Sequence, residues 1–142
     1  MIALCLGGAP SVWSDLSAAK ALLAGRPYLT IACNFAGERY PDHLDAWATL
    51  HPEYLPTWKR RRKSIGGNHP RLFCHIGHSD SPDIEPVPER FKGSSGLYMA
   101  QIAFEHLNAT GVILCGVPME QGAGHIHWPG PWSDPERYRG GL

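Results

Sequence analysis

Five short, continuous apolar runs dominate the sequence and restrict what it can fold into. Each holds four to six residues and is bounded by glycine, proline or histidine; the runs are residues 2–6, 28–33, 46–50, 71–76 and 112–115. Apolar residues in these runs are consecutive rather than alternating. That pattern is typical of strands covered on both faces, as in a parallel sheet.

Helical periodicity appears beside these runs. Two stretches place apolar residues on one stripe of a helix: Val12, Leu16, Ala19 and Leu23 in the first, and Leu97, Ala100, Phe104 and Leu107 in the second. A weaker helix is expected over residues 54–64. Strands that alternate with helices predict an α/β fold, a Rossmann-like three-layer sandwich with a mostly parallel sheet of about five strands. We expect residues 1–142 to form a single domain.

Composition excludes several classes of protein. The formal net charge is +0, which argues against nucleic acid as a partner. No apolar run approaches the roughly 20 residues of a transmembrane helix, so no membrane partner is expected. The cysteines Cys5, Cys33, Cys74 and Cys115 form no CxxC motif and lie in or at the end of apolar runs. Buried, reduced thiols and a cytoplasmic location are therefore expected.

The first strand is followed by a glycine-rich turn. Gly7, Gly8, Ala9, Pro10 and Ser11 lead into the first helix. Ligands of open α/β sheets bind beyond the carboxyl ends of the strands, and a helix start offers unpaired N–H groups to an anion. Ser11 is the expected N-cap. The same residues equally fit a simple strand-to-helix turn, and they match neither a Walker A loop nor the GxGxxG fingerprint.

Polar residues follow the second and third strands. Asn34 and Phe35 follow the second strand, and His51 follows the third. The Asn34 carboxamide has both a donor and an acceptor for a base or ribose, although an asparagine there also fits a structural turn. We assign all three residues to a candidate ligand site.

A second helix start made of small residues precedes the last helix. Ser94, Ser95 and Gly96 resemble the first glycine turn in composition and offer another place for an anion. Two such helix starts and an asparagine are expected at one edge of one sheet. This convergence predicts a shared ligand, to which we also assign Pro118 and Met119 after the fifth strand.

Histidines supply candidate catalytic groups. His125 and His127 lie in the glycine- and proline-rich loop 116–135, where either can serve as a general base. His75, His78 and Asp80, together with His125 and His127, offer imidazole and carboxylate ligands for zinc or manganese. No HExxH motif or cysteine–histidine zinc spacing is present. Solvent-exposed loop histidines explain the pattern as well, so a metal is not required.

Two further segments have simple interpretations. Residues 77–92, rich in Pro, Ser and Asp, are expected to form a surface loop. The five consecutive cations Lys59, Arg60, Arg61, Arg62 and Lys63 are expected on a solvated helix face, with Leu55 and Trp58 facing inward. A phosphate contact is the alternative for this run.

The order of these motifs resembles two groups of proteins that share a Rossmann-like core. Gly7-Gly8-Ala9-Pro10-Ser11, Cys33-Asn34-Phe35, Ser94-Ser95-Gly96 and Val112–Val117 resemble the bacterial CMP-sialic-acid-dependent sialyltransferases and the flagellar-accessory and hydroxymethylpterin-diphosphokinase-like proteins. The resemblance implies that Gly7, Gly8, Ser11, Asn34, Ser95 and Gly96 hold the nucleotide part of a donor. It also implies a catalytic histidine after the last strand, in the place of His125 or His127.

The chain departs from these groups in length and detail. It is about half the length expected of the sialyltransferases, which leaves no room for a lid over the acceptor, and it is similar in size to small phage-encoded proteins with this core. The expected function is binding of a nucleotide or nucleotide-activated sugar, with transferase activity if catalytic. A non-catalytic binder that sequesters a signalling nucleotide and a metal-dependent hydrolase are the alternatives. The sequence is also compatible with a homo-oligomer.

Overall fold

The structure, a computed structural model, describes residues 1–117. Six strands form one sheet: β1 (Ile2–Leu6), β2 (Tyr28–Cys33), β3 (Ala46–Thr49), β4 (Arg71–Cys74), β5 (Ile84–Pro86) and β6 (Gly111–Cys115). The helices are α1 (Val12–Leu23), α2 (Ala36–Arg39), α3 (Leu55–Ser64) and α4 (Ser95–His106), with a 3-10 turn, η1, at Pro52–Tyr54. The α/β prediction is confirmed.

All neighbouring strands of the sheet are parallel, in the order β5-β4-β3-β2-β1-β6. From β1 the chain adds β2 to β5 successively on one side, and then returns to place β6 on the other side of β1. Strand order therefore reverses between β1 and β6. In doubly wound sheets such a reversal marks the edge where ligands bind.

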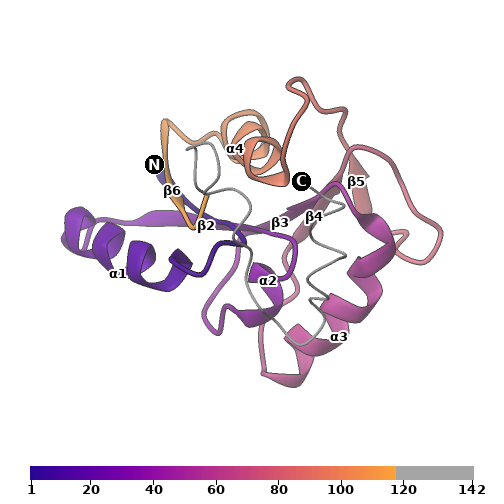
Figure 1. The fold of residues 1–142 in the computed structure, drawn as a ribbon, viewed down its shortest axis with the longest axis horizontal. Helices are drawn as coiled ribbons and strands as arrows, with labels where there is room; N and C mark the ends of the chain where they lie inside the picture. The colour runs from indigo at the N-terminus through magenta and orange to yellow at the C-terminus, as the bar shows by residue number, and fades with distance from the viewer. Residues whose placement is uncertain (118–142) are drawn as a thin grey trace.

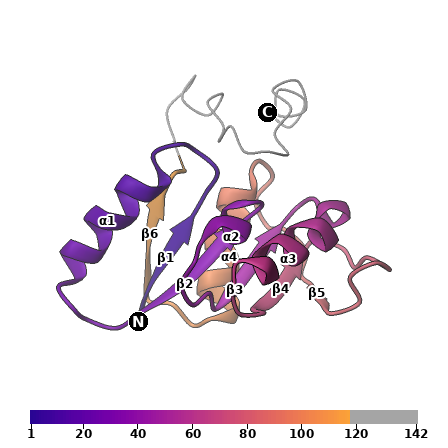
Figure 2. The ribbon, with the colours of Figure 1, turned by 90° about the horizontal axis from the view of Figure 1, so that it is seen from below.

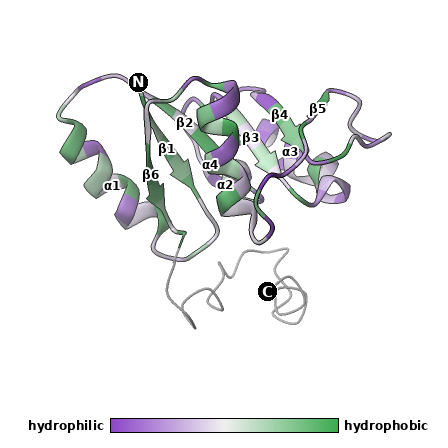
Figure 3. Ribbon diagram, turned by 90° about the horizontal axis from the view of Figure 1, so that it is seen from above, coloured by the Kyte–Doolittle hydropathy of each residue, from purple (hydrophilic) through white to green (hydrophobic). Residues whose placement is uncertain are grey.

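Helices cover both faces of the sheet and create three layers (Figure 1). Figure 2 shows α2 and α3 in front of the sheet and α4 behind it, and α1 lies over β1 and β6. Side chains of β1 alternate between the layers: Leu4 and Leu6 join the cluster under α1 to α3, whereas Ala3 and Cys5 join the cluster under α4. Both sides of each inner strand are thus apolar (Figure 3), which explains the continuous apolar runs.

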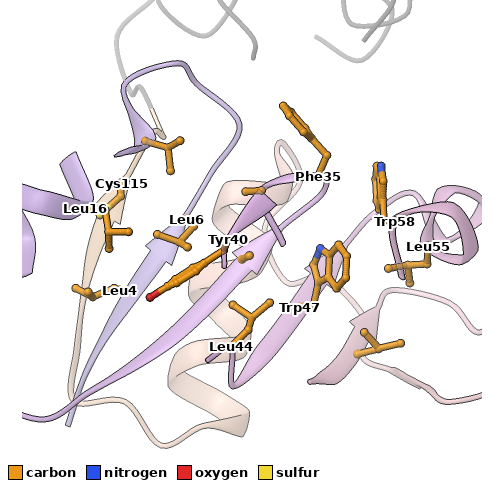
Figure 4. Close-up of a cluster of buried hydrophobic side chains, with 14 of the residues drawn as sticks. Leu4, Leu6, Leu16, Phe35, Tyr40, Leu44, Trp47, Leu55, Trp58 and Cys115 are labelled. Atoms are coloured by element: carbon orange, nitrogen blue, oxygen red, sulfur yellow. The ribbon is translucent and has the colours of Figure 1, made fainter. Parts of the chain in front are cut away.

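A group of aromatic rings fills the layer between the sheet and α3 (Figure 4). Trp47 of β3 stacks on Trp58 of α3 with ring centroids 6.3 Å apart, and Tyr54 lies 5.5 Å from Trp58. A Cβ atom on Gly37 would lie 2.3 Å from the Trp47 ring. The short helix α2, which was not predicted from the sequence, therefore approaches β3 through a residue without a side chain.

The prediction that residues 77–92 form only a surface loop is wrong. Within them, Ile84, Glu85 and Pro86 form β5, which pairs with Leu72, Phe73 and Cys74 of β4. Three residues are too few to show a period, and proline within a run suggests a loop. Pro86 is accommodated because β5 is the edge strand, where one side needs no ladder hydrogen bonds.

The predicted solvated face of α3 is wrong for one of its five cations. Arg62 is 2% exposed and lies with Leu55 and Trp58 on the buried side of the helix. These positions are three and four residues apart, so Arg62 belongs to the inward stripe by helical period. No described helix has the length and apolar character needed to cross a bilayer.

Candidate functional site

The carboxyl edge of the sheet brings the predicted small-residue turns together. The turn after β1 and the start of α4 both contact the residues that follow β6. A Cβ atom on Gly7 would lie 2.5 Å from Val117 Cγ2, and one on Gly96 would lie 2.7 Å from Val117 Cγ1. The two small-residue turns therefore lie close together, as predicted, and Val117 of the chain itself occupies the space between the two glycines.

Hydrogen bonds to the end of β6 occupy part of the glycine turn. The N–H of Gly7 donates to Cys115 O at 2.7 Å, and the N–H of Ala9 donates to Gly116 O at 3.0 Å. These two amides are thus unavailable to an anion. Gly8 differs, since nothing lies within 4 Å of a Cβ placed there. Of the two glycines in this turn, Gly8 is the one with open space beside its backbone.

Ser11 stands at the N-cap position of α1 but does not cap the helix with its side chain. Its hydroxyl donates to Asp15 Oδ2 at 3.1 Å, and the same carboxylate oxygen accepts the N–H of Gly116 at 2.8 Å. Asp15 therefore joins the first turn of α1 to the end of β6. A carboxylate there also repels a phosphate, which makes this helix start the weaker of the two anion sites.

The start of α4 is better suited to an anion. Ser94 caps the helix, accepting the N–H of Leu97 on its hydroxyl at 3.3 Å, and the first turn carries no acidic residue. Within the described part of the chain, the N–H groups of Ser95 and Gly96 have no hydrogen-bond acceptor. The helix dipole adds partial positive charge at this end of a 12-residue helix.

Asn34 is held in a defined orientation after β2. Its backbone is left-handed, with φ of 51°, and its carbonyl accepts the indole N–H of Trp47 at 2.5 Å. Its side-chain Oδ1 accepts the hydroxyl of Thr49 at 2.8 Å. Among residues 1–117, its Nδ2 group has no acceptor. Asn34 is thus both the turn residue and an oriented donor.

Thr49 links Asn34 to His51. The Thr49 side chain is fully buried, donates to Asn34 and accepts the backbone N–H of His51 at 2.9 Å. The His51 ring is partly exposed, with Nδ1 3.5 Å from Glu53 Oε1. Thr49 was not among the predicted site residues, although it is the one hydroxyl residue in the otherwise apolar run 46–50. A single polar residue within an apolar run is the feature of the sequence that could have identified Thr49.

Phe35, which was predicted to bind ligand, is 2% exposed and belongs to the apolar cluster under α1 to α3 (Figure 4).

Glu38, three residues further on, was not predicted as a site residue. It is 5% exposed; Arg61 Nη1 lies 3.3 Å from Oε1, while Oε2 has no partner among the described residues. Burial raises the pKa of Glu38 above its ordinary value, and the charge of Arg61 only partly opposes this.

The histidines after β4 make separate local contacts. His75 Nδ1 lies 3.3 Å from Cys74 Sγ, and His78 Nδ1 accepts the N–H of Asp80 at 3.3 Å. Burial raises the pKa of the Cys74 thiol. Within residues 1–117, no three His, Cys, Asp or Glu side chains come together as a metal site.

The remaining site predictions, Pro118, Met119, His125 and His127, lie outside the described residues. Comparison of the chain with known protein families, curated proteins and solved structures finds no match.

Proposed function

We propose that the protein binds a nucleotide or nucleotide-activated sugar at the carboxyl edge of its sheet, between Asn34 and the start of α4. The observation that carries the proposal is the oriented carboxamide of Asn34. Thr49 fixes its acceptor oxygen, which leaves the Nδ2 donor for a base or ribose oxygen. Such preorganisation reduces the entropy lost on binding.

The start of α4 supplies the anion-binding part of the proposed site. The N–H groups of Ser95 and Gly96, which have no acceptor among residues 1–117, suit a phosphate, and Ser94 holds the helix start in place. Gly8 belongs to the turn after β1 at the same edge of the sheet, and a Cβ atom placed on it would meet nothing within 4 Å, so a ligand can approach the backbone there. The glycine turn after β1 thus contributes space rather than most of the hydrogen bonds.

The proposal covers binding, and a reaction depends on groups beyond these. A small transferase requires a base for the acceptor hydroxyl, for which His125 and His127 remain the candidates. A non-catalytic binder requires none. The two functions differ in whether the ligand is consumed, so the experiment must measure both binding and product.

The test uses Asn34→Asp with Asn108→Asp as its control. The first substitution keeps an oxygen acceptor for Thr49 but replaces the Nδ2 donor with a carboxylate oxygen. Asn108 also has a left-handed backbone, with φ of 55°, and is exposed just before β6, at the opposite edge of the sheet. The control therefore makes the same chemical change away from the proposed site.

We expect a panel of nucleotides and nucleotide sugars to contain a ligand detected by calorimetry. Asn34→Asp should weaken its binding by about tenfold or more, as expected when a hydrogen-bond donor to the ligand is lost, while Asn108→Asp leaves it unchanged. Chromatography of the ligand after incubation, with His125→Ala and His127→Ala as further variants, distinguishes transferase from binder. The proposal fails if no member of the panel binds or if both aspartate variants bind equally.

A further inference from the structure

A cavity of ≈ 560 Å³ opens beside α3, and none of the residues proposed to bind the nucleotide lines it. Residues of α3, of the segment 67–70 and of β3 line it; they include Trp47, Lys59, Arg60, Arg62, Lys63 and His69. Asp80 is the acidic residue among those that line it. The volume falls within the range of small-molecule sites, about 300–1,000 Å³.

The cations around this cavity outnumber their acidic partners. One carboxylate, that of Asp83, serves both Lys59, at 3.0 Å, and His69, at 2.8 Å. Arg60 donates to the hydroxyl of Thr57, and no ion pair forms between Lys63 and a described acidic residue. A protein whose formal net charge is +0 therefore concentrates positive charge at this place.

Arg62 contributes a buried positive charge to the cavity wall. Its guanidinium donates to Asn68 O at 2.8 Å, Gly37 O at 3.0 Å and Asp42 O at 2.9 Å, and to Asn68 Oδ1 at 2.7 Å. All of these acceptors are neutral. Hydrogen bonds satisfy the donors, but no described carboxylate cancels the charge, and a low-dielectric wall screens it less than water does.

We propose that this cavity is a second binding site, for a small anion with two or more phosphate groups. Arg60 and Lys63 are the exposed groups that contact it, and Arg62 supplies a fixed positive field from the wall. The site shares no residue with the proposed nucleotide site, so the proposal extends beyond that function. The ligand's phosphates can belong to inorganic polyphosphate or to a nucleoside polyphosphate.

The experiment titrates the full chain with inorganic pyrophosphate and triphosphate at low salt, using calorimetry. The double variant Arg60→Gln/Lys63→Gln should weaken binding by about tenfold, with about fivefold for Arg60→Gln alone, since each removed charge is an exposed partner. Arg26→Gln is the matched control, because Arg26 is also exposed and its Nε bonds only a neutral acceptor, Leu23 O. It should leave the affinity unchanged.

Other probes separate this site from competing explanations. The proposal is overturned if Asn34→Asp abolishes pyrophosphate binding while Arg60→Gln/Lys63→Gln does not, because the anion then binds at the carboxyl edge. It is also overturned if Arg60→Gln and Arg26→Gln weaken binding equally, or if neither anion binds. A single-stranded oligonucleotide that binds through Arg60 and Lys63 when pyrophosphate does not would overturn it in favour of nucleic acid. Tighter binding of ATP than of triphosphate, with the same sensitivity to both substitutions, supports the site and indicates a nucleoside polyphosphate.

Discussion

Arg62 organises the backbone around α2 and α3. Its guanidinium donates to oxygens of Gly37, Tyr40, Asp42 and Asn68, which belong to segments separated by 6 to 25 residues from it. Burial lowers the pKa of Arg62, and the nearby Tyr40 opposes this. Arginine remains charged under these conditions because its pKa is far above neutrality. One buried side chain thus replaces water as the partner of several carbonyls.

At the residue scale we predict that Arg62→Met destabilises the protein strongly. Methionine retains the length of the apolar stem but leaves buried carbonyl oxygens without donors. The expected loss is about 2–4 kcal/mol in the free energy of unfolding. Arg60→Met, on the exposed side of the same helix, should cost less than about 0.5 kcal/mol. Denaturant unfolding of both variants checks the contrast, and similar losses would show that Arg62 is not structural.

At the scale of elements, Val117 connects the start of α4 to the turn after β1. Its two methyl groups occupy the space that side chains on Gly7 and Gly96 would need. Gly7 is further restricted, because a Cβ there would also lie 2.5 Å from the backbone oxygen of Gly116. The absence of side chains at Gly7 and Gly96 therefore allows Val117, two residues after β6, to pack against both turns. This contact determines how close the two helix starts lie.

We predict that Gly96→Ala destabilises the protein by about 1–2 kcal/mol through overpacking against Val117. Val117→Ala should recover part of this loss in the double variant, because the clash is with a side chain. The same partner should not rescue Gly7→Ala, whose clash includes backbone. Gly8→Ala is the control and should be close to neutral. A double-mutant cycle measured by thermal unfolding tests this, and additive effects of Gly96→Ala and Val117→Ala would contradict it.

For the whole molecule, the layered fold encloses all four thiols. Cys5, Cys33, Cys74 and Cys115 lie on four different strands, and each is buried and free. Burial raises the pKa of Cys33 to about 12, and burial together with the charge of Asp15 raises that of Cys115 to about 11. The predicted burial of the cysteines is confirmed. A thiol with a raised pKa and no access to solvent is a poor nucleophile.

We predict that Ellman's reagent reacts with none of the thiols faster than the protein opens. Raising the pH from about 7 to 9 ionises an ordinary free thiol, but it should accelerate the native reaction little. Unfolding in guanidinium should release all four thiols together. Stopped-flow absorbance gives the rate and the number of reacting groups. One rapidly reacting cysteine in the native protein would show that a strand is accessible.

Local patterns in the chain are enough to predict the layered architecture and the residues that follow each strand. Apolar runs such as 2–6 and 28–33 indicate buried parallel strands because burial on both faces leaves no polar alternation. Strand ends then place Asn34, His51 and the start of α4 at one edge. These inferences succeed because they depend on local periodicity and on a general rule for where parallel strands end.

The packing of the elements determines which of those groups already have a hydrogen-bond partner within residues 1–117. The amides of Gly7 and Ala9 bond to the end of β6, and Thr49 orients Asn34. Arg62 lies among distant carbonyls, although the charge run around it indicated solvent. Each of these contacts joins residues far apart in the chain or on different elements. Their partners follow from how the elements pack, and a linear pattern contains no direct record of that packing.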